Sequence, residues 1–219
     1  NVAGCAAIGP GESYPPPGHP SGYNFNWENG RILDEYQLNY ITEGEGIFET
    51  RLGKYPVKEG SVIIILPGMW HRYRPDETGW KEHYVGFNGD FAKKMFENEF
   101  FRESTPVVNI GYKENLLQHF YEIMDHVRTE KAGYQQICSG LVVYLLSCII
   151  SLKKNESFEG KEIEQVIQKA CILLRENLAK NLSMEILAHD LKIGYPYFRK
   201  KFRDYTGISP AQYHLSLRI

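Results

Sequence analysis

The spacing of apolar side chains divides the chain into regions of different expected structure. Between residues 34 and 89 the apolar positions form short runs, rich in β-branched and aromatic residues and separated by Gly and Pro. Short strands at this spacing predict a small β-barrel or sandwich. The expected strands cover residues 36–41, 47–50, 62–66, 71–73 and 80–87, with turns at 43–46 and 75–79.

Helical spacing follows these strands. Apolar stripes within residues 116–127 and 137–152 lie on either side of Gly133 and predict two amphipathic helices in an antiparallel hairpin. This hairpin is expected to pack on the barrel, on a second copy of the chain, or on both. Helical spacing resumes at residues 163–178.

Two segments show neither pattern. Residues 10–22 include five prolines and predict an irregular, extended arm. Residues 153–160 are polar and aperiodic, so they are expected to link two domains. The predicted fold is α+β, with a β domain and helical hairpin over residues 1–152, and an all-α domain over residues 161–219.

The C-terminal domain carries the most informative pattern. Ser183 is a good N-cap for a first short helix, and Lys192-Ile193-Gly194 gives a tight turn. A second helix is expected near residues 196–205, with a basic face opposite Phe198 and Phe202. This is the helix-turn-helix plan, in which the second helix enters the major groove of DNA.

Basic side chains of that second helix suit DNA contacts. Arg199 or Lys200 is placed to donate to guanine O6 and N7, a contact that provides roughly 1–3 kcal/mol of discrimination. Tyr195, Tyr197, Lys201 and Arg203 are expected to hold phosphates. The alternative is that these charges only solvate a surface helix.

The two parts of the chain differ in net charge. Residues 1–159 carry 15 Lys and Arg against 21 Asp and Glu (−6), whereas residues 160–219 carry 10 against 6 (+4). This asymmetry hints at a C-terminus that binds nucleic acid, although chance gives the same pattern.

Four cysteines without a CxxC pair indicate a reduced, cytoplasmic protein. No apolar run approaches the roughly 18 residues of a membrane span, so no membrane association is expected.

The C-terminal pattern resembles the first helix-turn-helix of AraC-type regulators. The matching positions are Leu187, Ala188, Leu191, Ile193, Phe198, Phe202, Gly207, Ser209, Pro210 and Tyr213. The chain departs at Gly194, where the family often has a capping Ser or Thr, and at Pro196, where many members carry a side chain that touches DNA. In the family a second helix-turn-helix follows. The sequence ends where the intervening helix would run, so we expect this fragment alone to bind DNA weakly or not at all.

The N-terminal half resembles the sensor domain of the same family, which is a cupin-like barrel. The matching positions are Gly44, Gly46, Gly60, Pro67, Gly68, His71, Tyr73, Gly79, Trp80, Phe87, Asn88 and Gly89. In sugar-binding members the barrel interior holds the effector. The resemblance places Glu43, Tyr73, Glu82 and Tyr84 at matching positions, and Trp80 shares a strand face with the last two. Aromatic walls with a few polar groups suit a small polar ligand such as a sugar, whereas the alternative is a filled barrel without a ligand.

Many cupins bind a metal, but this chain lacks the expected ligand set. His71 and His83 are candidates from different strands, and no His lies within residues 36–50. Since a catalytic zinc site usually needs three protein ligands, we expect neither metal nor cofactor. The main hypothesis is a homodimeric regulator that binds double-stranded DNA under the control of a small effector. The alternatives are a metal-dependent cupin enzyme acting on sugars, and a constitutive regulator whose barrel only dimerises.

Overall fold

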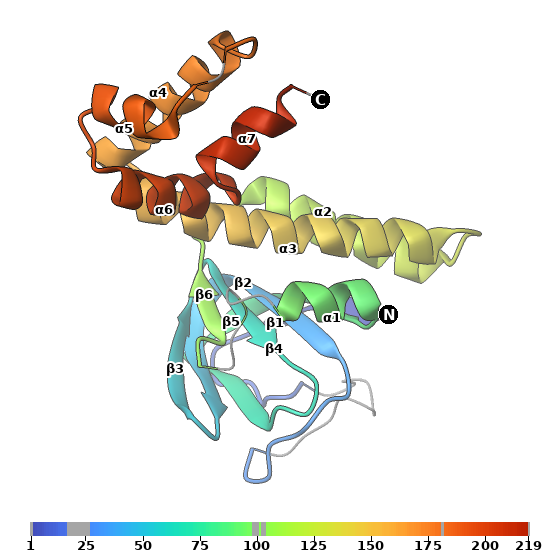
Figure 1. Ribbon diagram of the computed structural model, residues 1–219. Helices are drawn as coiled ribbons and strands as arrows, with labels where there is room; N and C mark the ends of the chain where they lie inside the picture. The colour runs from blue at the N-terminus through green and yellow to red at the C-terminus, as the bar shows by residue number, and fades with distance from the viewer. Residues whose placement is uncertain (1, 17–26, 98–100, 102–103, 181, 219) are drawn as a thin grey trace. The chain divides into compact units, whose positions relative to one another are not determined.

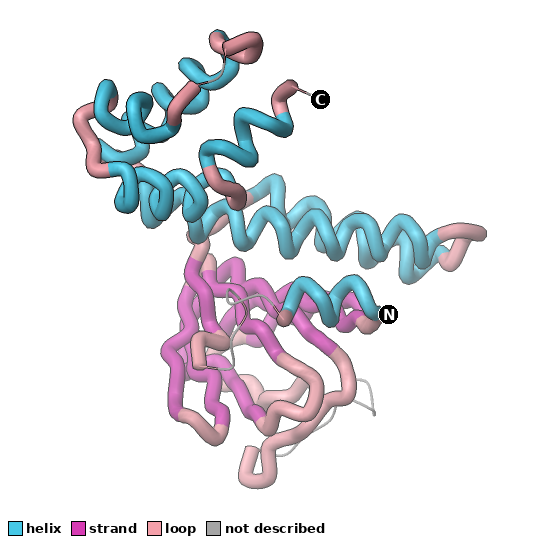
Figure 2. Tube along the Cα trace, viewed as in Figure 1, coloured by secondary structure: helices cyan, strands magenta, loops and turns pink. Residues whose placement is uncertain are grey.

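The computed structural model describes residues 2–16, 27–97, 101, 104–180 and 182–218. The chain forms two compact units, Asn1–Lys153 and Lys154–Ile219. Strands occur in the first unit, and the second is helical (Figures 1 and 2). The described part of the chain therefore has the expected α+β composition, with the strands before the helices of the second unit.

Six strands form one antiparallel sheet in the order β1-β5-β2-β4-β6, with β3 paired to β2. They are β1 (Val2–Ile8), β2 (Tyr36–Thr50), β3 (Gly53–Lys58), β4 (Ser61–Ile65), β5 (His71–Phe87) and β6 (Val107–Asn109). The sheet curls around an interior face, which we define by the buried cluster containing Ile41, Phe48 and Trp80. The sequence pattern did not predict β1 and β6, which pair with β5 and β4 across long stretches of chain.

Strands β2 and β5 are longer than predicted. The expected turns at 43–46 and 75–79 lie inside them, because the pairing of β2 with β5 shifts register between Ile41 and Glu43 and between Gly44 and Gly46. Gly44 has φ 84°, and an added Cβ there would lie 2.1 Å from the carbonyl oxygen of Gly79. These glycines therefore permit a close approach of two backbones within a bulged strand pair.

Seven helices lie among the described residues. They are α1 (Asp90–Phe96), α2 (Glu114–Thr129), α3 (Tyr134–Phe158), α4 (Glu162–Glu176), α5 (Met184–Asp190), α6 (Tyr195–Thr206) and α7 (Pro210–Ser216). The predicted helices of the hairpin correspond to α2 and α3, and those of the helix-turn-helix to α5 and α6. Helix α1 was not predicted.

Helix α3 continues through most of the segment that was expected to be an irregular linker. Residues 153–158 are helical, and the boundary between the two compact units falls inside the helix, after Lys153. The side chains of residues 154–157 are exposed, which explains their polar character. Phe158 is buried, and its ring lies edge-on to Tyr205 at 5.2 Å.

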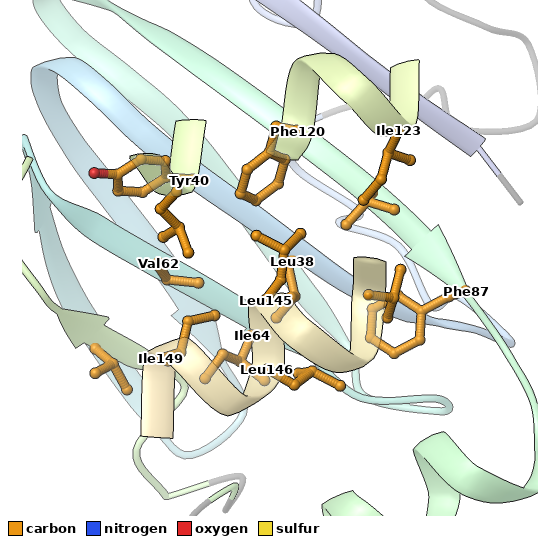
Figure 3. Packing of buried hydrophobic residues seen from close by; sticks show 14 of the residues in the cluster. Leu38, Tyr40, Val62, Ile64, Phe87, Phe120, Ile123, Leu145, Leu146 and Ile149 are labelled. Atoms are coloured by element: carbon orange, nitrogen blue, oxygen red, sulfur yellow. The ribbon is translucent and has the colours of Figure 1, made fainter. Parts of the chain in front are cut away.

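The main core lies between the outer face of the sheet and the hairpin. Leu38 and Tyr40 of β2 lie beside Phe120 and Ile123 of α2 and beside Leu145 of α3 (Figure 3). These five side chains have no more than 1% of their surface exposed. The amphipathic stripes that predicted the hairpin therefore pack on the sheet, as expected.

Helix α3 is also long and apolar enough to cross a membrane by length and composition, with a mean hydropathy of 1.7 over its most apolar window. No uninterrupted apolar run of that length occurs in this helix, but its average hydropathy is high enough because the interrupting polar residues do not lower it much. Leu145, Leu146 and Ile149 of this helix are fully buried in the core of the first unit. That burial is typical of the core helix of a folded domain.

The second unit has its own core. It gathers residues from α4, α5 and α6: Ile167, Ala170, Leu174, Met184, Leu187, Ala188, Phe198 and Phe202. The Phe198 and Phe202 rings meet edge-on at 5.5 Å. The predicted inward orientation of these two residues is therefore confirmed.

Replacing Leu38 by Ala is expected to destabilise the first unit by about 2–5 kcal/mol, because it removes a fully buried side chain and leaves a cavity. Leu52 lies in the turn after β2 with 60% of its surface exposed, so Leu52→Ala is the matched control and should cost less than about 0.5 kcal/mol. Urea unfolding of both variants gives the two free energies. Equal losses would contradict the core described here.

Candidate functional site

A cluster of polar and aromatic side chains lies on the interior face of the sheet. Tyr14, from the segment after β1, places its hydroxyl 3.0 and 3.2 Å from the two carboxylate oxygens of Glu82. Its ring lies 5.7 Å from the ring of Tyr73 and edge-on to Trp80 at 5.8 Å. Strand β5 therefore supplies all three of these contacts with Tyr14.

Arg31 supplies a buried cation to the same cluster. Its guanidinium donates to the Tyr73 hydroxyl at 2.6 Å, to His71 Nε2 at 3.1 Å and to Gln37 at 3.4 Å. The side chain is 9% exposed. Burial lowers the pKa of His71 to about 4, so its ring is neutral and accepts from Arg31.

Burial also changes the protonation of the carboxyl group in this cluster. It raises the pKa of Glu82 to about 7, although the hydrogen bond from Tyr14 and the charge of Arg31 act in the opposite direction. Glu82 is 2% exposed. The interior therefore holds a carboxyl group that exchanges its proton near neutral pH.

Three further polar atoms of the interior face lack a hydrogen-bond partner among the described residues: Asn39 Nδ2, Asn39 Oδ1 and Trp80 Nε1. Gln37, Asn39 and Ile41 are two residues apart along β2, so their side chains point to the same face of the sheet. Asn39 pairs with Tyr84 of β5. Each unpaired buried group costs about 1–3 kcal/mol. Unpaired donors and acceptors beside Glu82 are suited to a ligand that carries several hydroxyl groups.

The residues predicted to bind an effector do not all meet. Tyr73, Trp80 and Glu82 are buried together on the interior face, and Tyr84 is half-buried beside Gly4. Glu43 lies apart from them: its side chain is 71% exposed and pairs with Lys81 at 3.6 Å. The register shift after Ile41 interrupts the alternation of β2, which the sequence pattern could not reveal.

Sequence analysis also missed several members of the cluster. Arg31 and Tyr14 lie outside the predicted strands, and Asn39 is an uncommon residue in a strand. The one available signal was the alternation of Gln37, Asn39 and Ile41, which places two amides on a single face.

The two candidate metal ligands lie in different surroundings. His71 belongs to the interior cluster, whereas His83 contacts Phe120 and Tyr121 of α2 on the outer face. Among the residues that the structure describes, no three His, Cys, Asp or Glu side chains are grouped so that they could hold a metal ion.

In the second unit, α5 and α6 form the expected helix-turn-helix. Ser183 caps α5 by accepting from the backbone N–H of Ile186 at 3.3 Å. Helix α6 begins after Gly194, which offers no side-chain cap, and ends at Gly207 with φ 87°. The N-terminal backbone N–H groups of α6 thus have no side-chain acceptor at the N-cap, which is the effect expected of the departure at Gly194.

Helix α6 presents two different faces. Tyr195, Pro196, Arg199, Lys200 and Arg203 line a groove of about 810 Å³ that continues to the start of α7. Lys201 points elsewhere: its ammonium lies 5.8 Å from the Phe158 ring and 5.9 Å from the Tyr197 ring, and it pairs with Asp204 at 3.9 Å. Five of the seven predicted DNA-binding residues therefore share one face, and Tyr197 and Lys201 lie on another.

A curled sheet with a polar interior cluster, followed by a helix-turn-helix with a basic groove, defines a sensor and DNA-binding class of protein. The family of AraC-like ligand binding domains matches residues 6–146, and the bacterial regulatory helix-turn-helix proteins of the AraC family match residues 174–213. The chain belongs to the AraC family.

Characterised relatives are distant. The chain is 26% identical to the MmsAB operon regulatory protein of Pseudomonas aeruginosa over 192 residues, which are 85% of this chain and 61% of the relative. It is 21% identical to the lactose operon transcription activator of Staphylococcus xylosus, over 90% of this chain and 70% of the relative. A crystal structure of ToxT from Vibrio cholerae O395 covers 99% of this chain and 98% of its own, with 10% identity and a TM-score of 0.39.

The raised pKa of Glu82 predicts how the free energy of unfolding depends on pH. Its pKa of about 7 in the folded protein lies above the ordinary value of 4.5, so the folded protein binds this proton more tightly than the unfolded chain. The stability that the proton contributes is fully present below about pH 4.5 and is lost as the pH rises through 7. Relative to Glu82→Gln, the wild-type free energy of unfolding should fall by roughly 3 kcal/mol between pH 4.5 and 8.

Urea unfolding of both proteins across that range measures the effect. Burial lowers the pKa values of His71 and His83 to about 4, which favours stability as the pH rises, but these contributions cancel in the difference between the two proteins. A difference that stays constant with pH would contradict the assignment to Glu82.

Proposed function

We propose that this chain is the sensor and first DNA-reading part of a transcription regulator that a small polar effector controls. The regulator binds double-stranded DNA as a homodimer in the cytoplasm. One observation carries the proposal: a single chain joins a buried polar cluster with unpaired hydrogen-bonding atoms to a helix-turn-helix with a basic groove.

The effector site consists of Tyr73, Trp80, Glu82 and Asn39, with Tyr84 at its margin. Two aromatic rings offer apolar faces, and the carboxyl, amide and indole N–H offer directional partners. This combination suits a small polyhydroxylated ring such as a sugar. The relative named for the lactose operon supports a sugar as the class of effector.

Control requires only that the effector binds more tightly to one arrangement of the regulator than to another. The effector and DNA then change each other's affinity by the same factor. Equal affinity of the effector for the free and the DNA-bound full-length protein would contradict effector control.

The exposed face of α3 is the surface we assign to a second copy of the chain. Ile137 and Tyr144 are 45% and 48% exposed, and Leu141 and Cys148 are partly buried. Their spacing of four, three and four residues is that of a coiled-coil seam, and the adjacent face of the helix, with Leu145 and Ile149, packs in the core of the first unit. Within this stripe, Leu141 and Cys148 border that core, whereas Ile137 and Tyr144 leave apolar surface exposed, which suits pairing with a second copy.

Placing a charge in that stripe should separate the protomers. We expect Ile137→Glu combined with Tyr144→Glu to weaken the dimer at least tenfold, because both carboxylates would lose water at the seam. Sedimentation equilibrium measures the dissociation constant. Gln136→Glu, which adds a charge at an exposed position beside the stripe, is the control. An unchanged dissociation constant in the double variant would place the interface elsewhere.

The face of α6 that lines the groove should determine DNA affinity. Arg199→Ala or Lys200→Ala is expected to cost about 1–3 kcal/mol on specific DNA, because each removes a charged donor that enters the major groove. Lys201→Ala removes the same charge from the other face and should cost less. Fluorescence anisotropy of the full-length protein on DNA upstream of its own gene, at several salt concentrations, measures the affinities.

The salt dependence separates the two kinds of contact. A residue that holds only a phosphate should reduce the slope of log K against log salt by about one and weaken all sequences equally. A residue that reads a base should also relax specificity at one position. Equal losses in all three variants would contradict the orientation of α6, and an absence of specific binding with or without sugars would contradict the proposal itself.

A further inference from the structure

Tyr14 fills space that the proposed effector site would offer to a ligand. Its ring touches Tyr73 and Trp80, and its hydroxyl reaches both oxygens of Glu82. The residue belongs to no strand or helix, and its three partners lie on one strand of the sheet. A ring with a hydroxyl group, held by two aromatic faces and a carboxyl, is the mode of binding that suits a small cyclic ligand.

We propose that Tyr14 is an internal occupant of the effector site, and that the effector is a neutral hydroxylated ring that takes the place of its phenol. This inference rests on the proposed function, because it concerns the regulation and ligand class of the same site. Effector and Tyr14 exclude one another.

The segment around Tyr14 is held locally. Before it, Ile8 is paired with Trp80 at the end of β1, and a short turn follows in which the Glu12 carboxylate accepts from the Gly9 backbone N–H at 2.9 Å. Residues 11–13 are exposed. The phenol can therefore leave the interior through rotations in exposed backbone while β1 stays paired, as expected of a region of low local stability.

Some polar groups of the site make no hydrogen bond to Tyr14, and a ligand that bonds to them can displace it. A phenol has one hydroxyl group, which Glu82 engages; among the described residues the Trp80 indole N–H has no partner, and the Asn39 amide lies near the Tyr73 hydroxyl without a hydrogen bond of ordinary length. A ring with several hydroxyl groups can satisfy Glu82 and these groups together. The effector thus gains hydrogen bonds that the internal occupant does not make, which offsets the loss of Tyr14.

The charges of the cluster favour a neutral ligand. Arg31 already donates to His71, Tyr73 and Gln37, so its donors are engaged within the protein. The carboxyl group of the cluster, Glu82, repels an anion when it is ionised, and His71 is neutral above about pH 4. Among the described residues of the cluster an acidic effector therefore meets no cation with a donor to spare, whereas a neutral polyol meets donors and acceptors.

The first test uses p-cresol, which is the side chain of tyrosine as a free molecule. Isothermal titration calorimetry of the whole chain should show that Tyr14→Ala binds p-cresol at least tenfold more tightly than the wild type, because the variant vacates the matching space. Tyr112→Ala removes a tyrosine that is 46% exposed and should behave as the wild type. Circular dichroism checks that each variant is folded. Equal p-cresol affinity in a folded Tyr14→Ala and the wild type would overturn the proposal.

The second test concerns the effector. Galactose, arabinose, glucose and lactose are titrated into the wild type, Tyr14→Phe and Tyr14→Ala. A sugar that binds should gain at least tenfold in affinity in Tyr14→Ala, less in Tyr14→Phe, and should compete with p-cresol. A sugar that binds the wild type and Tyr14→Ala equally would overturn mutual exclusion. Failure of every sugar to change DNA binding by the full-length protein would reject effector control by sugars, and the p-cresol result would stand separately.

Discussion

Strands β2 and β5 pair antiparallel over almost their whole lengths. Glycines allow the pairing to continue where its register shifts and the backbones come close together. Gly46 and Gly79, like Gly44, leave no room for a side chain: an added Cβ would lie 2.3 Å from the carbonyl oxygen of Arg74 and 2.1 Å from that of Ile8. Because β1, β3 and β4 all pair with one of these two strands, the curl of the sheet depends on this pairing. The pairing of β2 with β5 therefore positions the side chains on both faces of the sheet.

The two faces of β5 serve different neighbours. Glu82 points into the interior, and the next residue, His83, contacts Phe120 and Tyr121 of α2 and places Nε2 3.1 Å from the Thr42 hydroxyl. A change in the interior that shifts the backbone at residue 82 therefore acts on the hairpin through one peptide unit. The close packing between β5 and α2 makes this a short physical path from the interior face to a helix pair.

Elements with strong local signals could be predicted, and elements that depend on distant pairing could not. The apolar run 62–66 anticipated β4, and the apolar periods anticipated α2, α3 and the helix-turn-helix. Residues 43–46 were predicted as a turn because Gly favours turns and bulges alike, and only pairing with β5 decides between them. Strand β1 was missed because its small residues carry little β signal before they meet a partner about 80 residues away. Of the predicted effector residues, Trp80, Glu82 and Tyr84 could be grouped by strand alternation and Tyr73 by the family resemblance, but Arg31 and Tyr14 reach the site from irregular segments.

A carboxyl group that titrates near neutrality couples the binding of any group that hydrogen-bonds to it to the uptake or release of a proton. An occupant that donates a hydrogen bond to Glu82 favours the carboxylate and releases a proton to the buffer, whereas one that accepts from Glu82 favours the neutral acid and takes a proton up. The preference of Glu82 for a hydrogen-bond donor over an acceptor therefore depends on the pH. If Glu82 binds the effector as proposed, the response of the regulator depends on the concentration of the effector and on the pH together.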